Sequence, residues 1–81
     1  MKTVYVLRSV RDPEQWYVGI TEELTARLVA HNAGQSSHTA KFKPWKLFVS
    51  INFENHRKAE EFERYLKTGS GRAFAAKHFR T

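Results

Sequence analysis

Four side chains near the start of the sequence could act together in proton transfer and anion binding. Tyr5 and Tyr17 fall in two short apolar runs, and antiparallel pairing of these runs makes the two phenols cross-strand neighbours or near-neighbours. Arg27 and His31 are four residues apart in a predicted helix, so they project from one side of it. A guanidinium there suits phosphate, and an imidazole can move protons. The alternative is structural: half-buried strand tyrosines and a solvated helix pair.

One carboxylate could add a metal ligand. Glu63 lies four residues after Ala59 and three before Leu66, at the border of a predicted apolar stripe, so its carboxylate can be partly buried. The alternative is a surface ion pair, because Lys67 follows at the favourable spacing of four. The sequence has no glycine-rich phosphate loop and no cysteine, and its four histidines are spread too widely to predict a metal cluster.

Two predicted strands and one helix must position the first four residues. Residues 4–7 and 16–20 are β-branched and aromatic runs around a polar turn with Asp12-Pro13, which predicts a hairpin. Gly19, inside the second run, indicates a bulge or a close approach by another backbone. A helix is predicted over 22–32, and its ends are marked by the residues Thr21 as N-cap, Glu22 and Glu23 in the first turn, and Gly34 as the stop.

The rest of the chain predicts one more strand and two helices. Residues 35–44 form a polar, basic loop with room for a helical turn. Residues 45–53 form a strand in which Leu47, Val49 and Ile51 alternate with Phe48, Ser50 and Asn52. Helices follow over 56–67 and 71–79, with Asn55 and Ser70 as their N-caps. We therefore predict one α+β domain over residues 1–81, a small, mainly antiparallel three-stranded β-sheet flanked by helices in the order β-β-α-β-α-α.

Composition favours a polyanionic partner. The 81 residues carry 14 basic and 8 acidic side chains, for a net charge of +6, which predicts DNA as the partner without excluding RNA, although such charge can also serve solubility alone. The absence of cysteine, of a signal-like start and of a long apolar run predicts a cytoplasmic chain with no membrane segment. The candidate nucleic-acid contacts form two basic patches: Lys41, Lys43 and Lys46, and Arg64, Lys67, Arg72, Lys77 and Arg80.

Several of these residues, taken in order, resemble a known family. The elements are Thr3-Val4-Tyr5, Tyr17-Val18-Gly19, Arg27, His31-Asn32-Ala33-Gly34 and the run from Ala59 to Lys67. Together they resemble the GIY-YIG nuclease superfamily, most closely its small stand-alone bacterial members, and they are similar to the nuclease domain of the bacterial excision-repair incision enzyme. The likeness covers nearly the whole chain.

The resemblance implies a role for each matched residue. Tyr5 and Tyr17 match the motif tyrosines, Arg27 the phosphate-binding arginine, His31 a helix histidine and Glu63 the ligand of one Mg²⁺ or Mn²⁺ ion. Arg8 matches an auxiliary basic position. Tyr5 would orient or deprotonate the attacking water. Its proton could be displaced by nearby cations that lower its pKa, or pass to His31, and the sequence leaves both routes open.

Three positions depart from the family pattern. Thr3 replaces the first motif glycine and Val18 the isoleucine, and neither change removes a reactive group. An active-site asparagine that many members carry about a dozen residues after the glutamate would fall near Ala75, and residues 64–81 contain no asparagine. Its role is then missing, or it passes to one of three nearby side chains: Ser70, Arg72 or His78.

The resemblance implies a metal-dependent endonuclease that hydrolyses DNA phosphodiester bonds. With no room for a separate DNA-reading module in 81 residues, the expected targets are branched, nicked or damaged DNA, with a protein partner as another source of specificity. The alternative is a catalytically impaired nucleic-acid-binding module, or an adaptor of a larger repair or recombination complex. The absent asparagine favours this alternative, whereas the complete set of two tyrosines, arginine, histidine and glutamate favours the enzyme.

Overall fold

The computed structural model describes residues 1–80, which form a three-stranded sheet between two layers of helices. The strands are β1 (Lys2–Ser9), β2 (Trp16–Thr21) and β3 (Trp45–Phe53), and both pairings are antiparallel in the spatial order β2-β1-β3. Strand β1 is therefore central and β2 is an edge strand. The predicted hairpin is confirmed as the β1–β2 pair.

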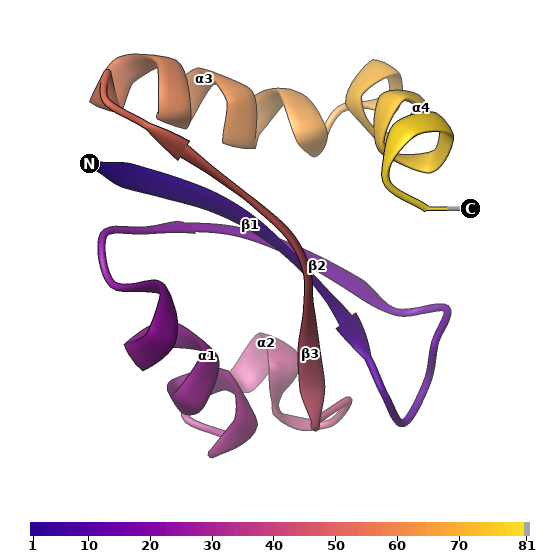
Figure 1. The fold of residues 1–81 in the computed structure, drawn as a ribbon. Coiled ribbons are helices and arrows are strands. Elements are labelled where there is room, and N and C mark those ends of the chain that lie inside the picture. Colours follow the sequence, from indigo (N-terminus) through magenta and orange to yellow (C-terminus); the bar gives the residue numbers. More distant parts are fainter. Residues whose placement is uncertain (81) are drawn as a thin grey trace.

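The four helices are divided between the two faces of the sheet (Figure 1). Helices α1 (Leu24–Asn32) and α2 (Ser37–Ala40) lie on one side, and α3 (His56–Leu66) and α4 (Gly69–His78) lie on the other. The predicted α+β fold is confirmed, and α2 is the helical turn for which the 35–44 loop had room. None of the helices formed by the described residues has the length and apolarity needed to cross a bilayer.

Alternation along β1 builds two separate cores. Val4 and Val6 pack with the α3–α4 layer, whereas Tyr5 and Leu7 pack with Trp45 and the α1 layer. All four side chains are buried, with exposures of 4% or less. Because successive strand residues point to opposite faces, Tyr5 is directed toward α1 and its buried polar groups.

A bulge changes the predicted facing of β3. The β1–β3 register shifts between Val6, which faces Val49, and Leu7, which faces Leu47. Phe48 is the extra residue, so Leu47 does not share a face with Val49, as its simple alternation had predicted. Phe48 instead makes an edge contact with the Trp16 ring, with 4.9 Å between the ring centroids.

Two helix starts differ from the prediction. Helix α1 begins at Leu24 rather than 22, because β2 continues through Thr21 and the Thr21 hydroxyl accepts a hydrogen bond from the Glu23 amide, outside the helix. Helix α4 begins at Gly69, and Thr68 rather than Ser70 caps it by accepting from the Gly71 amide. The other ends follow the prediction: Asn55 caps α3, and Gly34, at φ 79°, follows α1.

Helices α3 and α4 touch through their backbones at Gly71. A Cβ atom at this position would lie 1.8 Å from the Tyr65 carbonyl oxygen, so only glycine permits this approach. The contact fixes the first turn of α4, which carries Arg72, against the last turn of α3, which precedes Lys67.

Candidate active site

Tyr5 owes its position to a glycine on the edge strand. Tyr5 pairs with Gly19 in the β1–β2 register, and a Cβ atom on Gly19 would lie 2.3 Å from the Tyr5 hydroxyl oxygen. The phenol therefore lies across the space that any other side chain would fill. The predicted close approach at Gly19 is real, but a tyrosine ring makes it rather than a backbone.

A buried chain of hydrogen bonds begins at the Tyr5 hydroxyl. Its oxygen lies 2.9 Å from Nε2 of His31, and Nδ1 of His31 lies 2.8 Å from the Thr39 hydroxyl oxygen. Thr39 in turn donates to the Ser36 carbonyl at 3.4 Å. Tyr5, His31 and Thr39 are each no more than 1% exposed. Because the Thr39 proton is directed to a carbonyl, its oxygen is free to accept from Nδ1–H, which favours the tautomer whose Nε2 accepts the Tyr5 proton.

Burial keeps both members of this pair uncharged. It raises the pKa of Tyr5, against a lowering by the Arg27 guanidinium and a smaller one by the Lys67 ammonium. It also lowers the pKa of His31, and the positive charge of Arg27 adds to that lowering. Tyr5 is therefore a phenol and His31 a neutral imidazole at pH 7, so the cations do not produce a standing phenolate.

Tyr17 and Arg27 lie at the open side of this chain. The Tyr17 ring centroid is 6.3 Å from that of Tyr5 and 4.8 Å from that of His31. The Tyr5 hydroxyl beside the Arg27 guanidinium raises the pKa of Arg27, which stays charged and exposed on α1. The structure thus brings together Tyr5, Tyr17, Arg27 and His31, with one cation that solvent can reach.

Glu63 lies on α3, in the helix layer on the other face of the sheet from Arg27 and His31. Its carboxylate is partly buried, with 14% of the side chain exposed, and it forms an ion pair with Lys67, 2.5 Å away. Lys67 lines the same groove as Tyr17, so the pair lies on the side of α3 that faces β2. The surface pair and the partly buried carboxylate, which were alternatives in the sequence, are both present. No hydrogen bond joins Glu63 to the four clustered residues within the part of the chain described.

One carboxylate is a sparse but workable site for a hard cation. Residues 1–80 contain no group of three or more histidine or acidic side chains that could enclose a metal. Magnesium often binds through one or two carboxylates, several waters and substrate phosphate. Glu63 supplies one such oxygen donor beside the groove, and the Lys67 ammonium must give way when a metal binds. The donor set fits a metal that is completed by its substrate.

Arg8 and Asn32 lie outside the cluster. Arg8 is three residues beyond Tyr5 and on the other face of β1, where its guanidinium carbon lies 4.8 Å from the centre of the Trp16 ring. It therefore does not assist Tyr5. The Asn32 amide bonds both backbone groups of Trp45, so it fastens the end of α1 to β3 and does not replace the absent asparagine.

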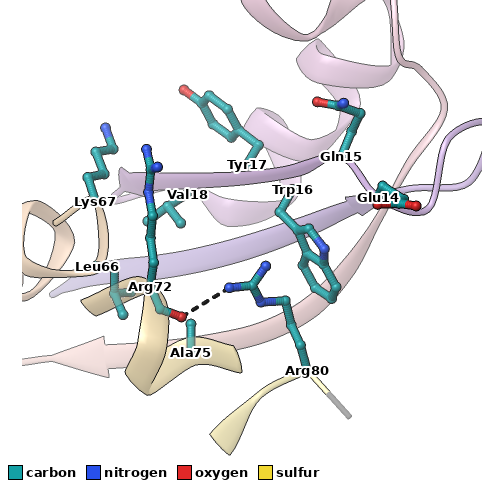
Figure 2. A pocket seen from close by; sticks show the side chains of 10 residues that line it. All are labelled: Glu14, Gln15, Trp16, Tyr17, Val18, Leu66, Lys67, Arg72, Ala75 and Arg80. Atoms are coloured by element: carbon teal, nitrogen blue, oxygen red, sulfur yellow. Dashed lines mark hydrogen bonds between the residues drawn. The ribbon is translucent and has the colours of Figure 1, made fainter. Parts of the chain in front are cut away.

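A groove between β2 and α4 borders the Tyr17 side of the cluster (Figure 2). Ala75, near which the family asparagine would fall, lines it and is 7% exposed. Of the three substitutes considered for that asparagine, Arg72 lines the groove, while Ser70 and His78 do not. Of the eight predicted nucleic-acid contacts, three line it, Lys67, Arg72 and Arg80, and five do not, namely Lys41, Lys43, Lys46, Arg64 and Lys77.

Two residues of this region were not predicted as functional. Thr39 supports His31 from a segment predicted as a loop, where no periodic pattern marks a buried hydroxyl. Trp16 was assigned only to a strand, although a tryptophan at the start of an edge strand beside many arginines was an available signal for cation–π contacts.

Comparison with known proteins agrees with this small α+β fold. Residues 1–77 match the family model of the GIY-YIG catalytic domain. The chain belongs to the GIY-YIG family.

Three relatives are similar over most of the chain. The structure-specific endonuclease subunit SLX1 of Debaryomyces hansenii is 37% identical over 71 residues, which are 79% of this chain and 20% of that protein. A UPF0213 protein of Lactococcus lactis subsp. cremoris is 38% identical over 52 residues, 63% of this chain and 53% of the relative. A UPF0213 protein of Clostridium perfringens is 38% identical over 68 residues, which are 83% of this chain and 71% of the relative. The chain thus spans a fifth of the first relative and about half of the second.

Proposed function

We propose that this chain is a metal-dependent endonuclease that hydrolyses DNA phosphodiester bonds. The observation that carries the proposal is the Tyr5 hydroxyl, 2.9 Å from a buried, neutral imidazole and beside a solvent-exposed guanidinium. A hydroxyl with its own proton acceptor, next to a cation that suits phosphate, is what an attack by water on a phosphodiester requires. Family membership and the SLX1 likeness support the same activity.

Each residue then has a role that follows from its place. Arg27 binds the scissile phosphate through its planar fork of N–H groups. Tyr17, at the open side, donates a hydrogen bond to a phosphate oxygen. Tyr5 orients the attacking water and accepts its proton as its own proton moves to Nε2 of His31. The pKa directions favour this route over a standing phenolate, because burial raises the pKa of Tyr5.

The proton transfer has a cost that the site must offset. The ordinary pKa values of a phenol and an imidazole differ by about 3.5, so moving a proton between them costs about 5 kcal/mol. Burial, which raises the pKa of Tyr5 and lowers that of His31, adds to this cost before substrate binds. The Arg27 charge stabilises the phenolate that forms, and Thr39 holds the imidazole in the orientation that accepts the proton. The step therefore belongs to the bound complex.

Glu63 would hold one Mg²⁺ or Mn²⁺ ion together with the substrate phosphate. The ion would neutralise charge that develops on the phosphoryl oxygens and on the leaving oxygen. The Glu63 carboxylate is partly buried and already holds one cation, the ammonium of the groove residue Lys67, which supports this role.

The substrate we propose is DNA with a particular structure rather than a particular sequence. The printed name of the Debaryomyces relative describes a structure-specific endonuclease subunit, and this chain matches a fifth of that protein. Branched or nicked DNA is the corresponding target, and a protein partner is a further source of specificity.

A nucleic-acid-binding module without cleavage is the second candidate. It is favoured by Ala75, which stands near the place of the family asparagine and has no group that can bind phosphate or metal. In this case the basic groove would bind nucleic acid as part of a larger repair or recombination complex, and the Tyr5 chain would only stabilise the α1 layer.

A nicking assay with two matched variants separates the candidates. Wild type, Glu63→Gln and Glu61→Gln are compared on branched, nicked, duplex and single-stranded DNA with Mg²⁺ and with EDTA. Glu61 is an exposed carboxylate on the same helix, paired with Lys58. We expect Mg²⁺-dependent cleavage by wild type and Glu61→Gln, and a loss of at least about 100-fold in Glu63→Gln, the scale on which one electrostatic group contributes to catalysis.

The contrary outcomes are equally clear. A wild type that binds DNA but cleaves none of the panel would favour the binding module. Full activity of Glu63→Gln would remove this carboxylate from the reaction. A thermal unfolding curve accompanies each variant and shows whether its fold persists.

A further inference from the structure

The groove between β2 and α4 is basic on one wall and aromatic on the other. It has a volume of about 490 Å³ and is lined by Trp16 and Tyr17 from β2, by Lys67 from the end of α3, and by Arg72 and Arg80 from α4 and its continuation. Figure 2 shows the Trp16 indole and the Arg72 and Arg80 side chains facing this space, with Lys67 beside Arg72. Glu14 is the acidic side chain at its rim.

The arginines of this region carry charge that no carboxylate offsets. The ion pairs formed by residues 1–80 join Lys2, Lys58 and Lys67 to glutamates, and none involves an arginine. Arg8 and Arg80 are held instead by backbone carbonyls: Arg8 Nε donates to the Pro13 oxygen at 2.8 Å, and Arg80 Nη2 donates to the Arg72 oxygen at 3.1 Å. Both guanidiniums keep N–H groups for a further acceptor.

Trp16 holds two of these cations in place. The guanidinium carbon of Arg8 lies 4.8 Å from the ring centre and that of Arg80 lies 5.1 Å from it. The bulge of β3 places Phe48 against the same ring. Such contacts stabilise a cation over an aromatic face, so the guanidiniums are ordered before any ligand arrives.

Backbone packing fixes the third arginine. The close contact of Gly71 with the Tyr65 carbonyl holds the start of α4 against α3, and Arg72 is the next residue. Arg72 and Lys67 then stand side by side, and Tyr17 lines the same groove from β2. The groove therefore continues from the tyrosine that borders the candidate active site to the Trp16 cluster.

We propose that this groove binds one single strand of nucleic acid, the strand whose phosphodiester bond lies at Tyr17 and Arg27. Arg72 and Arg80 contact successive phosphates, and Trp16 holds the Arg80 guanidinium in place for this contact. The inference rests on the proposed function and deepens it: the substrate has a single-stranded segment directly beside the cleaved bond, as a flap or branch does.

The size and composition of the groove favour one strand over a duplex. A volume of about 490 Å³ lies within the range of about 300–1,000 Å³ typical of small-ligand sites, which admits a few nucleotides but does not enclose a double helix. Cations that follow a backbone next to aromatic rings are typical of single-strand sites, which bind without sequence preference.

Binding in EDTA tests the groove without cleavage. The probes are a fluorescein-labelled 12-nucleotide single strand and a blunt duplex of the same sequence, measured by anisotropy over a range of salt. Wild type is compared with Arg72→Gln/Arg80→Gln and with Arg57→Gln/Lys58→Gln, a control with the same charge change in the first turn of α3, outside the groove. Trp16→Leu tests the ring, and thermal unfolding shows that each variant is folded.

We expect tighter binding of the single strand than of the duplex by wild type. The Arg72→Gln/Arg80→Gln variant should bind the single strand about tenfold more weakly, or weaker still. The slope of log affinity against log salt concentration should become shallower by about 1.4, since each phosphate contact on a single strand contributes about 0.7. Trp16→Leu should weaken single-strand binding by up to about tenfold, because the ring no longer holds the Arg80 guanidinium in place. The control variant should keep the wild-type slope.

Two results would contradict the proposal that the groove binds a single strand. One is an equal loss of affinity in the groove and control variants, which would assign the positive charge to solubility. The other is binding of the duplex at least as tight as binding of the single strand. These outcomes are independent of catalysis. A chain that shows the expected binding but never cleaves DNA disproves the endonuclease alone, and one that cleaves DNA while groove variants bind normally disproves the groove alone.

Discussion

The two sides of strand β2 are built in opposite ways. Toward α1, Tyr5, His31 and Thr39 are buried and joined by hydrogen bonds of 2.9 and 2.8 Å. No buried side-chain nitrogen or oxygen in residues 1–80 lacks a hydrogen-bond partner. Toward α4, Arg72 is exposed and Arg80 half-buried, and neither forms an ion pair with a carboxylate of the described chain.

We therefore expect the α1 side of β2 to serve cleavage and the α4 side to serve nucleic-acid binding. A rigid, neutral and fully bonded chain fixes the position of one hydroxyl, whereas a groove with unpaired cations favours a polyanion without defining its sequence. Substitutions on the α1 side should therefore reduce cleavage more than affinity, and substitutions on the α4 side should do the reverse. The predictions that follow test the α1 side, beginning with the largest effect.

Among substitutions that leave the reacting side chains themselves unchanged, Gly19→Ala should have the largest effect on cleavage. The added Cβ would lie 2.3 Å from the Tyr5 hydroxyl oxygen, so the phenol must leave its place beside His31. A misplacement of about 1 Å costs on the order of 100-fold in rate, and overpacking costs about 1–3 kcal/mol of folding free energy. Cleavage rates and urea unfolding measure the two effects.

Gly69→Ala is the matched control for this change. A Cβ on Gly69 meets nothing within 4 Å, and the residue opens α4, where alanine is the better helix former. Cleavage should be unchanged and stability equal or slightly higher. If Gly19→Ala behaved like this control, the position of Tyr5 would not depend on the glycine.

Thr39→Val should have an intermediate effect. Valine has nearly the same shape but cannot accept from Nδ1 of His31, which leaves a buried N–H without a partner and costs about 1–3 kcal/mol. With the tautomer no longer fixed, cleavage should fall about tenfold beyond any loss of folded protein, and Thr39→Ser should restore it. A serine variant as slow as the valine variant would point to packing of the methyl group instead.

The pH dependence should be the mildest signature. The pKa of folded His31 lies below its ordinary 6.5, so the unfolded chain binds a proton first as the pH falls. The free energy of unfolding is then greatest above about pH 6.5 and decreases as the pH is lowered toward the folded pKa. His31→Gln should remove this part of the decrease in urea titrations. The acid limb of the cleavage profile should likewise lie below pH 6.5, and a limb above it would contradict a neutral, buried imidazole.

Much of the fold followed from sequence because its signals are local. The apolar runs predicted all three strands, and the stripe of Ala59, Phe62 and Leu66 predicted α3, whose members do pack in the core. The predicted face of Leu47 was wrong because a bulge depends on pairing with the partner strand and cannot be seen in the sequence of β3 alone. The cap at Thr21 was wrong because β2 continues through Thr21, whose hydroxyl bonds the Glu23 amide before the helix begins. The cap at Ser70 was wrong because the Thr68 hydroxyl accepts from the Gly71 amide.

The candidate site was predictable in part for the same reason. Spacing placed Arg27 and His31 on one side of α1, and strand pairing placed Tyr17 near Tyr5. Thr39 could not be found this way, because its contact with His31 depends on how the chain turns between α1 and β3. Arg8 lies on the other face of β1 from Tyr5, because a spacing of three along a strand reverses the face.

The central claim, that the Tyr5 hydroxyl takes part in phosphodiester hydrolysis, is tested most directly by Tyr5→Phe. Single-turnover cleavage of a flapped DNA in Mg²⁺ is compared among wild type, Tyr5→Phe and Tyr65→Phe, whose tyrosine is exposed on α3. We expect Tyr5→Phe to lose about 10²–10⁴-fold in rate while it keeps wild-type affinity for the single strand, and Tyr65→Phe to remain fully active. A folded Tyr5→Phe variant that cleaves at the wild-type rate would contradict the claim.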